Sequence, residues 1–375
     1  MPAVAVLGPR QSGKTTLVKM VFPDYLYVSL EDPDTLDRIE KDPRGFLERA
    51  IKHPGVIFDE FQRFAQLASY LQGFIDQLQK PGFFILTGSQ KYLMMQSIAQ
   101  SLAGRVALLK LLPLSLAELA AANLLPDDYC QSAWRGFYPR SYAAGIEPRD
   151  WVPSHLEQYI ERDVRSVLAI KDLRTFQQFI GLCAGRVGQQ LNISSLAVEA
   201  GINQATAKQW LSLLEASYLI ILLQPWSTNI NKRLVKTPKL YFTDSGLVCA
   251  LLKITSAEQL AQHYSMGSIF ENMIVTELLK DRFNQGDISN LYFIRSARGE
   301  EVDIVLEYAD HIRLVEIKAT ATIKTELFKG LRYWKEHLEE KKQCFLVHGG
   351  LQPAESFSDI TVVGWQHSGV IARSP

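Results

Sequence analysis

The feature that most constrains the fold of this chain is a phosphate-binding loop that starts at residue 8. An apolar run, AVAVL at residues 3–7, leads directly into GPRQSGKT, and a helical stretch that begins TTLVKM follows. The eight loop residues match G-x-x-x-x-G-K-[ST] at every fixed position, in the strand, loop and helix order that gives this motif its meaning. A chance glycine-rich turn is the alternative, and the flanking strand and helix disfavour it.

The residue types in this loop suit the chemistry of a nucleotide phosphate. Backbone N–H groups of a glycine-rich loop close around phosphate oxygens, and the N-terminus of the following helix favours an anion. Lys14 adds a positive charge near the β and γ phosphates, and Thr15 offers a hydroxyl group to Mg²⁺. We expect the nucleotide and its Mg²⁺ to contact Gly8, Pro9, Arg10, Gln11, Ser12, Gly13, Lys14, Thr15 and Thr16.

Two further apolar runs end in polar residues that suit the same site. The run GVIF ends in Asp59 and Glu60, and FFIL ends in TGSQ at residues 87–90. We predict that Asp59 holds Mg²⁺ through water and that Glu60 polarises the attacking water. Ser89 is expected to sense the γ-phosphate or to position water, because ligands bind at the carboxyl edge of such sheets. A solvated acidic loop and a capped turn are the respective alternatives.

The arrangement of apolar runs predicts an α/β protein with three domains in 375 residues. Strand-like and helical stretches alternate over the first hundred residues, which is typical of βα units on a parallel sheet. The apolar spacing is helical from 155 to 225, and strands return after residue 238. We predict a P-loop ATPase core at 1–112, a helical lid and winged-helix region at 113–240, and an α/β domain at 241–375.

Composition excludes several classes of protein. The formal net charge is zero, so contact with nucleic acid requires a local basic patch. The four cysteines lie too far apart for a zinc or disulfide pattern. The longest apolar stretches, such as YLIILL, are too short to span a membrane, and no charged and apolar leader opens the chain. We expect a cytoplasmic protein that does not engage a membrane.

The order of the phosphate loop, the Asp-Glu strand, TGSQ and SLAGR resembles the AAA+ superfamily. The similarity is strongest to a prokaryotic branch with GPRQ-x-GKTTL and DE-x-QR motifs, and it spans residues 1–240. It implies ATP with Mg²⁺, a homo-oligomer, and an arginine that acts across a subunit boundary. Arg105 and Arg63 are the candidates, and either could instead be a surface or salt-bridged arginine. Only seven residues precede Gly8, where relatives carry a helix beside the base, so ATP or GTP preference stays open.

Residues 194–219 read as a helix-turn-helix, with a turn at Ala200 and Gly201 and an N-cap at Asn203. Apolar residues up to Tyr218 follow helical spacing. Polar residues on the second helix and a basic segment after it are candidates for DNA contact, because such patches anchor phosphates. These candidates are Gln204, Lys208, Gln209, Lys232, Arg233 and Lys236, with Lys239 in the same basic segment. A lid or a subunit contact is the alternative.

Four residues near the C-terminus predict a second site. Glu271 lies on the expected helix SIFENMIVTELL, and Asp303 lies in GEEVDIVLE, at the end of the first of two expected hairpin strands. Glu316 and Lys318 share one face of the second strand, VEIK. This set resembles the PD-(D/E)xK nuclease superfamily over residues 265–350, which implies a restriction-endonuclease-like α/β domain that binds Mg²⁺ or Mn²⁺. An inactive scaffold and an exposed ion pair are the alternatives.

The sequence therefore predicts an ATP-hydrolysing AAA+ protein that acts on DNA and carries a nuclease-like C-terminal domain. Its rival is a nucleotide-controlled switch that binds a protein partner, with an inactive nuclease-like scaffold. The physiological substrate, the activity of the C-terminal domain and the oligomer size cannot be predicted from the sequence.

Overall fold

The computed structural model describes residues 1–89, 91–143, 146–159, 172–227, 237–357 and 359–373. The chain forms two compact units: Met1–Pro113 with Ala216–Tyr218, and Leu114–Glu215 with Leu219–Pro375. The predicted middle and C-terminal domains fall largely in the second unit, so their separation at residue 240 stays a prediction. Among the residues described, no helix combines the length and the hydrophobicity needed to cross a membrane.

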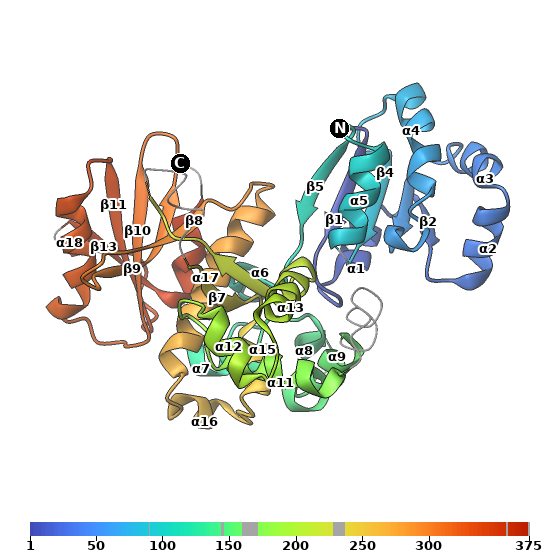
Figure 1. Ribbon diagram of the computed structural model, residues 1–375. Coiled ribbons are helices and arrows are strands. Elements are labelled where there is room, and N and C mark those ends of the chain that lie inside the picture. The colour runs from blue at the N-terminus through green and yellow to red at the C-terminus, as the bar shows by residue number, and fades with distance from the viewer. Residues whose placement is uncertain (90, 144–145, 160–171, 228–236, 358, 374–375) are drawn as a thin grey trace. The chain divides into compact units, whose positions relative to one another are not determined.

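The first unit is built on a five-stranded, all-parallel sheet flanked by helices (Figure 1). In sheet order, its strands are β2 (Leu26–Ser29), β3 (Val56–Asp59), β4 (Phe84–Gly88), β1 (Ala3–Leu7) and β5 (Val106–Lys110). The connecting helices are α1 (Lys14–Val21), α2 (Pro33–Lys41), α3 (Pro43–Ala50), η1 (Phe61–Phe64), α4 (Leu67–Leu78) and α5 (Lys91–Ser101). The predicted parallel α/β sheet is confirmed, with β5 as an additional edge strand.

The sheet explains why the polar loop residues gather in one place. All residues of β3 and β4 are buried, as expected for parallel strands covered on both faces. Because β1, β3 and β4 run in the same direction, their carboxyl ends meet at one edge. The phosphate loop, Asp59 with Glu60, and Thr87 with Ser89 all follow those ends.

Helices dominate the segment after Pro113, as predicted. They are α6 (Leu116–Ala121), α7 (Tyr129–Arg135), α8 (Arg140–Ala143), α9 (Pro148–Tyr159), α11 (Leu173–Ala184), α12 (Ile193–Glu199) and α13 (Gln204–Ala216). Gly201 turns the chain between α12 and α13 with φ +68°. The Asn203 side chain accepts a hydrogen bond of 2.8 Å from the N–H group of Thr206, so the predicted N-cap is confirmed.

The predicted helix boundary after α13 is wrong. The helix ends at Ala216, and Tyr218 has a left-handed backbone with φ 59°. The apolar run that follows is strand β6 (Ile220–Leu223), which pairs antiparallel with β7 (Lys239–Phe242). A short apolar run has no periodicity that separates a buried strand from a buried helix, which accounts for the error.

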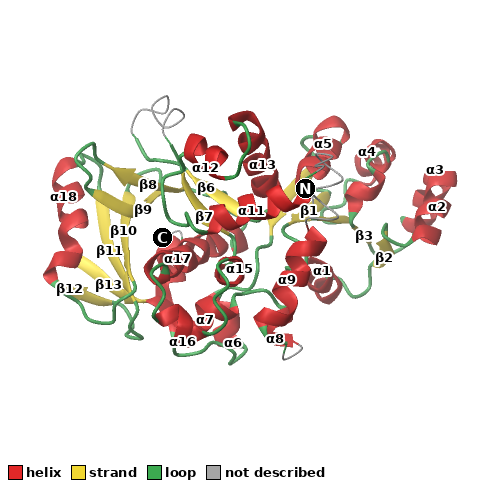
Figure 2. Cartoon of the chain, turned by 60° about the horizontal axis from the view of Figure 1, so that its bottom comes forward, coloured by secondary structure: helices red, strands yellow, loops and turns green. Residues whose placement is uncertain are grey.

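The last part of the chain forms a six-stranded mixed sheet in the order β12-β13-β11-β10-β9-β8. Helices α17 (Met266–Asn284) and α18 (Lys329–His337) pack on its opposite sides (Figure 2). The strands are β8 (Leu291–Arg295), β9 (Glu301–Glu307), β10 (Ile312–Lys318), β11 (Lys342–His348), β12 (Glu355–Phe357) and β13 (Ile360–Gly364). The predicted C-terminal sheet is confirmed, and β12 and β13 extend it.

Shorter helices complete this second unit. They are α15 (Ser245–Leu251), α16 (Ala257–Ala261), η3 (Thr325–Phe328) and η4 (Trp365–Ala372).

Candidate functional site

The phosphate loop in the first unit is a tightly packed cradle. A Cβ atom added at Gly8 would lie 2.0 Å from the carbonyl oxygen of Leu111, so only glycine fits there. The buried Lys14 ammonium group donates to the carbonyl oxygens of Gly8 and Pro9, at 3.0 and 2.7 Å. The buried Ser12 hydroxyl has no hydrogen-bond partner among the described residues. An unpartnered hydroxyl beside a lysine in a glycine loop fits a phosphate group.

The loop backbone turns sharply just before α1. Gln11 and Gly13 have positive φ angles of 61° and 95°, and the helix begins at Lys14. Thr16 lies exposed on the first helical turn, and Arg10 is half-buried within the loop. This geometry places the free N–H groups of a helix N-terminus at the loop, as anion binding requires.

Asp59 anchors a hydrogen-bond network next to the loop. Its carboxylate accepts from the Thr15 hydroxyl, at 2.9 and 3.1 Å to its two oxygens, and from the Tyr27 hydroxyl at 2.7 Å. Thr87 also donates to Asp59. Burial and this hydrogen bond raise the pKa of Tyr27 well above its ordinary value, which keeps it a donor. The paired Thr15 hydroxyl and Asp59 carboxylate are oxygen ligands of the kind that Mg²⁺ prefers, so these residues fit the expected ion.

Glu60 is held in a strained and well-defined position. Its backbone is left-handed, with φ 55° and ψ 48°, and its N–H group donates to the Thr87 hydroxyl at 3.1 Å. The Glu60 carboxylate accepts from the Ser89 hydroxyl at 2.9 Å and from the Gln62 side chain. The structure therefore brings Glu60 and Ser89 together, beside Asp59.

The predicted C-terminal residues also lie together, in the second unit. Strands β9 and β10 pair antiparallel with Ile304 opposite Val315, which puts Asp303 opposite Glu316 on one face. The Lys318 ammonium nitrogen is 2.6 Å from a Glu316 oxygen and 3.5 Å from an Asp303 oxygen. The other Asp303 contact fixes its orientation, since the N–H group of Ile317 donates to it at 2.8 Å.

Lys239, which the sequence analysis assigns to a basic DNA-binding segment, belongs to the same cluster. Lys239 is 3% exposed, and its ammonium nitrogen lies 3.2 Å from a Glu271 oxygen and 3.8 Å from an Asp303 oxygen. It also forms an ion pair with Glu301. Tyr241 donates its hydroxyl to Glu271 at 2.5 Å. The prediction that Lys239 belongs to an exposed DNA-binding segment is therefore wrong, because β7 turns its side chain into the protein interior.

The cluster perturbs the acidity of its members. Burial and the charge of Asp303 raise the pKa of Glu271 to about 7, against the opposing effect of Lys239. The same two causes raise the pKa of Glu316 to about 8, although Lys318 opposes them. Burial alone would lower the pKa of Lys239, but the surrounding carboxylates outweigh it, so the pKa of this lysine is raised and it stays charged.

This arrangement does not fit a divalent metal ion. Two ammonium groups, from Lys239 and Lys318, already lie between the carboxylates of Glu271, Asp303 and Glu316. Among the described residues, no group of three or more histidine, cysteine and carboxylate side chains is arranged to hold a metal. The predicted Mg²⁺ or Mn²⁺ at these residues therefore disagrees with the side-chain geometry.

The DNA-contact candidates divide into two groups. Gln204, Lys208 and Gln209 are exposed near the N-terminal half of α13. Lys232, Arg233 and Lys236 lie outside the described residues. The helices and the hairpin of β6 and β7 are in the predicted order, and Gln190 forms an isolated bridge with Lys239.

Three families match successive parts of the chain. Residues 1–120 match a family described as an AAA domain, which agrees with the loop and acid geometry above. The N-terminal part of this chain is therefore similar to AAA domains, and residues 1–113 are called the AAA domain below. Residues 126–258 match a domain of unknown function, DUF8612, and residues 266–367 match another, DUF4143.

Proteins of similar sequence align with most of this chain. Uncharacterized protein Rv2008c of Mycobacterium tuberculosis is 28% identical over 328 residues, covering 86% of this chain and 71% of that protein. Uncharacterized protein MJ1544 of Methanocaldococcus jannaschii is 24% identical over 355 residues, covering 83% and 73%. Among solved structures, the Walker-type ATPase PABY2304 of Pyrococcus abyssi aligns with 67% of this chain and 91% of its own, at 14% identity and a TM-score of 0.42. At that TM-score the likeness carries no argument.

The two arginine candidates lie at different edges of the AAA domain. Arg105 precedes β5 at the amino edge of the sheet and forms a two-pronged ion pair with Asp76, at 2.6 and 2.9 Å. Arg63 follows Glu60 on η1, at the carboxyl edge, with a 3.4 Å contact to Glu31. The role of either arginine across a subunit boundary stays a prediction.

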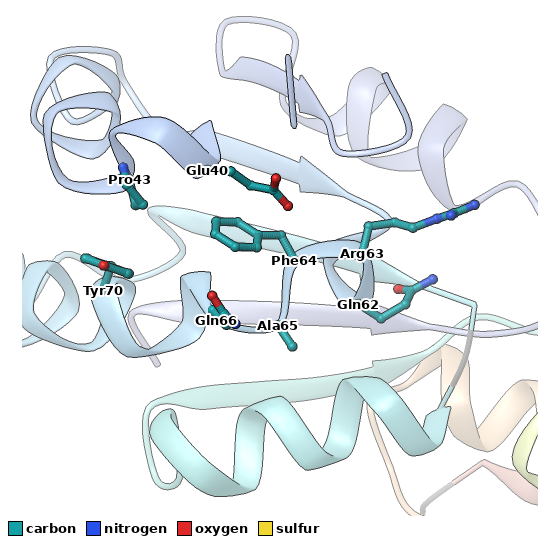
Figure 3. A pocket seen from close by; sticks show the side chains of 8 residues that line it. All are labelled: Glu40, Pro43, Gln62, Arg63, Phe64, Ala65, Gln66 and Tyr70. Carbon is teal, nitrogen blue, oxygen red and sulfur yellow. The ribbon is translucent and has the colours of Figure 1, made fainter. Parts of the chain in front are cut away.

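A hollow of about 540 Å³ lies next to Glu60 in the AAA domain. It is lined by residues of α2, α3, η1 and α4, and Figure 3 shows Gln62 and Arg63 on one side of it with Pro43 and Tyr70 on the other. Gln62 belongs both to this hollow and to the hydrogen bonds of Glu60. Gln62 therefore connects this hollow with the Glu60 carboxylate.

Sequence reasoning missed several residues that the structure places in these sites. Tyr27 carries no signal, because it reaches Asp59 only through the pairing of β2 with β3. Glu301 and Asp303 are two positions apart on one strand, and so are Lys239 and Tyr241. The strand period of two could have placed each pair on one face of its strand. That the two faces contact each other depends on the tertiary fold, which this periodicity does not encode.

Proposed function

We propose that this protein binds ATP with Mg²⁺ and hydrolyses it in the AAA domain. The observation that carries this proposal is the contact between the Thr15 hydroxyl and the Asp59 carboxylate at 2.9 Å, beside the Lys14 ammonium group. In this proposal Thr15 and Asp59 would hold the Mg²⁺ ion, which would supply positive charge to the phosphates. Lys14 binds the β and γ phosphates, together with the loop N–H groups.

Glu60 is the group that we assign to the attacking water. Its carboxylate lies next to Asp59 in sequence, and Ser89 and Gln62 fix its orientation by hydrogen bonds. A carboxylate held by two donors keeps one direction, which is what a water-positioning residue requires. Ser89 lies 3.4 Å from the Gln62 amide as well, so the three side chains form one network.

Nucleotide binding tests this proposal directly. Lys14→Ala should abolish tight binding of a fluorescent ATP analogue, because it removes the positive charge at the phosphates. Lys52→Ala removes an equally charged but exposed lysine of the same unit and should bind like the wild type. Equal affinity in the Lys14 variant and the wild type would contradict the assignment of the loop.

We further propose that the second unit acts on DNA through a winged-helix element. The observation that favours DNA is the exposed polar face of α13, with Gln204, Lys208 and Gln209 near its N-terminal half. A helix presented in this way suits the major groove. The nuclease-like domain takes part as a scaffold in this proposal, since its carboxylates are paired with lysines.

The rival proposal is a nucleotide-controlled switch that binds a protein partner. Rates of ATP turnover, measured with and without duplex or single-stranded DNA, distinguish these two proposals. A DNA-dependent ATPase should turn over ATP several-fold faster with DNA present, whereas turnover of the switch should not change. A flat response to every form of DNA would reject the DNA proposal and leave ATP hydrolysis intact.

A further inference from the structure

The acidic cluster of the second unit is organised around a lysine. Lys239 contacts three carboxylates at once: Glu271 at 3.2 Å, Asp303 at 3.8 Å, and Glu301 in an ion pair. The ring of Phe293 lies 5.6 Å from the same ammonium nitrogen. Carboxylate oxygens are also the ligands that divalent metals such as Mg²⁺ prefer, so this lysine and a metal ion would compete for the same oxygens.

The backbone on both sides of Lys239 fixes this position. On one side, β7 pairs with β6, with Lys239 opposite Leu223. On the other side, Gly188 donates to the Leu240 carbonyl oxygen at 2.8 Å, and Leu191 donates to the Pro238 carbonyl oxygen at 2.9 Å. The lysine is therefore held by a strand and its neighbour, and its side chain has little freedom to leave.

From this placement we infer that Lys239 is the resident cation of the cluster and excludes divalent metal from it. A Mg²⁺ or Mn²⁺ ion needs oxygen ligands at roughly 2.0–2.2 Å, which would bring it against the ammonium group. Two cations at such a short distance in a buried site repel each other strongly. The C-terminal domain thus carries the acidic residues of a metal site without binding the metal.

A second observation concerns an oxygen ligand that this cluster could still offer to a metal ion. The Oε2 atom of Glu316 is buried and has no hydrogen-bond partner among the described residues. Glu316 is 7% exposed, and this oxygen lies beside Gly330 on α18. Removal of the Lys239 charge would leave Glu271 without its lysine, and would leave Asp303 paired with Lys318 and Glu301 paired with Arg295 only. Such a set of carboxylates should then bind a divalent ion.

Mn²⁺ binding to the full chain, followed by electron paramagnetic resonance without nucleotide, tests the inference. The wild type and the Asp303→Asn variant should bind the same amount of Mn²⁺, because the wild type holds no Mn²⁺ at this cluster. Lys239→Met, which keeps an unbranched side chain but removes the charge, should gain one Mn²⁺ per chain, and Asp303→Asn should abolish that gain. Wild-type Mn²⁺ binding that is lost on Asp303→Asn would overturn the inference.

Folding of the variant is controlled separately. Lys239→Met leaves the buried Glu271 without its lysine partner, so the unfolding temperature of the variant should fall without metal and recover with Mn²⁺. A folded variant that binds no Mn²⁺, or an unfolding temperature that Mn²⁺ does not raise, would contradict the inference. Because these measurements require no nucleotide, they can contradict the inference about Lys239 without contradicting the proposal of ATP hydrolysis. Likewise, a failure of the ATP hydrolysis proposal would leave the inference about Lys239 untouched.

Discussion

At the scale of single residues, the orientation of the Glu60 carboxylate depends on two donors. Gln62 and Ser89 both donate to the same Glu60 oxygen. Hydrogen bonds to a charged group stabilise it more than neutral ones do, so loss of one donor lets the carboxylate rotate. Residues that position a catalytic group in this way affect turnover more than binding.

We therefore expect Gln62→Ala to lower the rate of ATP turnover about tenfold and to leave ATP affinity nearly unchanged. Gln66→Ala is the matched control, because Gln66 is an exposed glutamine of the same segment and makes no such contact in the described structure. Steady-state turnover and equilibrium binding measure the two effects. A Gln62 variant with wild-type turnover would show that Glu60 does not need this donor.

A buried carboxylate on α17 predicts a pH effect on stability. Burial raises the pKa of Glu277 to about 7, against the effects of Lys280 and of the Leu116 N–H group. Since its pKa in the folded state is above the value of the unfolded chain, the proton binds more tightly to the folded protein. The stability that this group contributes is full below pH 4.5 and is lost as the pH rises through about 7.

Glu277→Gln should remove that part of the pH dependence. Between pH 5 and pH 8 the free energy of unfolding should fall by about 2 kcal/mol less in the variant than in the wild type. Urea denaturation at both pH values measures the difference, with Glu336→Gln, at an exposed position of α18, as control. Parallel pH profiles for wild type and Glu277→Gln would contradict the assignment.

The residues of the AAA site show how much a sequence can predict. The loop from Gly8 to Thr15 and the pair Asp59 and Glu60 are contiguous motifs, so their place at one sheet edge follows from strand order. Tyr27 and Gln62 enter the same site through side-chain contacts that no spacing encodes. Lys239 was misplaced for a related reason: a lysine in a basic stretch reads as exposed, and its three acidic partners are distant in sequence.

At the scale of elements, α13 carries the proposed contact with DNA. Lys208 is exposed on this helix, and reversal of its charge should repel phosphates. We expect Lys208→Glu to weaken binding of duplex DNA about tenfold or more at low salt, measured by fluorescence anisotropy. Lys329→Glu makes the same charge change at an exposed position of α18. Equal losses in both variants would indicate a general charge effect and not a recognition helix.

The hairpin of β6 and β7, which follows α13 in the chain, shows where hydrophobic periodicity no longer predicts the type of element. Long strands of the C-terminal sheet were predictable, because β9 and β10 are each seven residues long and rich in apolar residues. Strand β6 was not, since four apolar residues after a helix continue its hydrophobic pattern. The left-handed backbone at Tyr218, which separates helix from strand, is set by the fold.

At the scale of the whole molecule, the resemblance to AAA+ proteins predicts self-association that depends on nucleotide. If Arg105 acts in a neighbouring subunit, turnover per subunit should rise with protein concentration, and Arg105→Ala should lower turnover about tenfold with ATP binding intact. Asp76→Asn is the control, because it breaks the same ion pair from the other side. Light scattering that shows a monomer with full activity would reject the prediction, and equal effects of both variants would make Arg105 a structural residue.

Phosphate release by three proteins tests whether the AAA domain hydrolyses ATP with Glu60 positioning the attacking water. The wild type should release phosphate in a Mg²⁺-dependent reaction. Glu60→Gln should bind ATP as the wild type does and release phosphate at least about 100-fold more slowly. Glu48→Gln, at an exposed position of the same unit, should match the wild type. Phosphate release by Glu60→Gln at the wild-type rate would contradict the account.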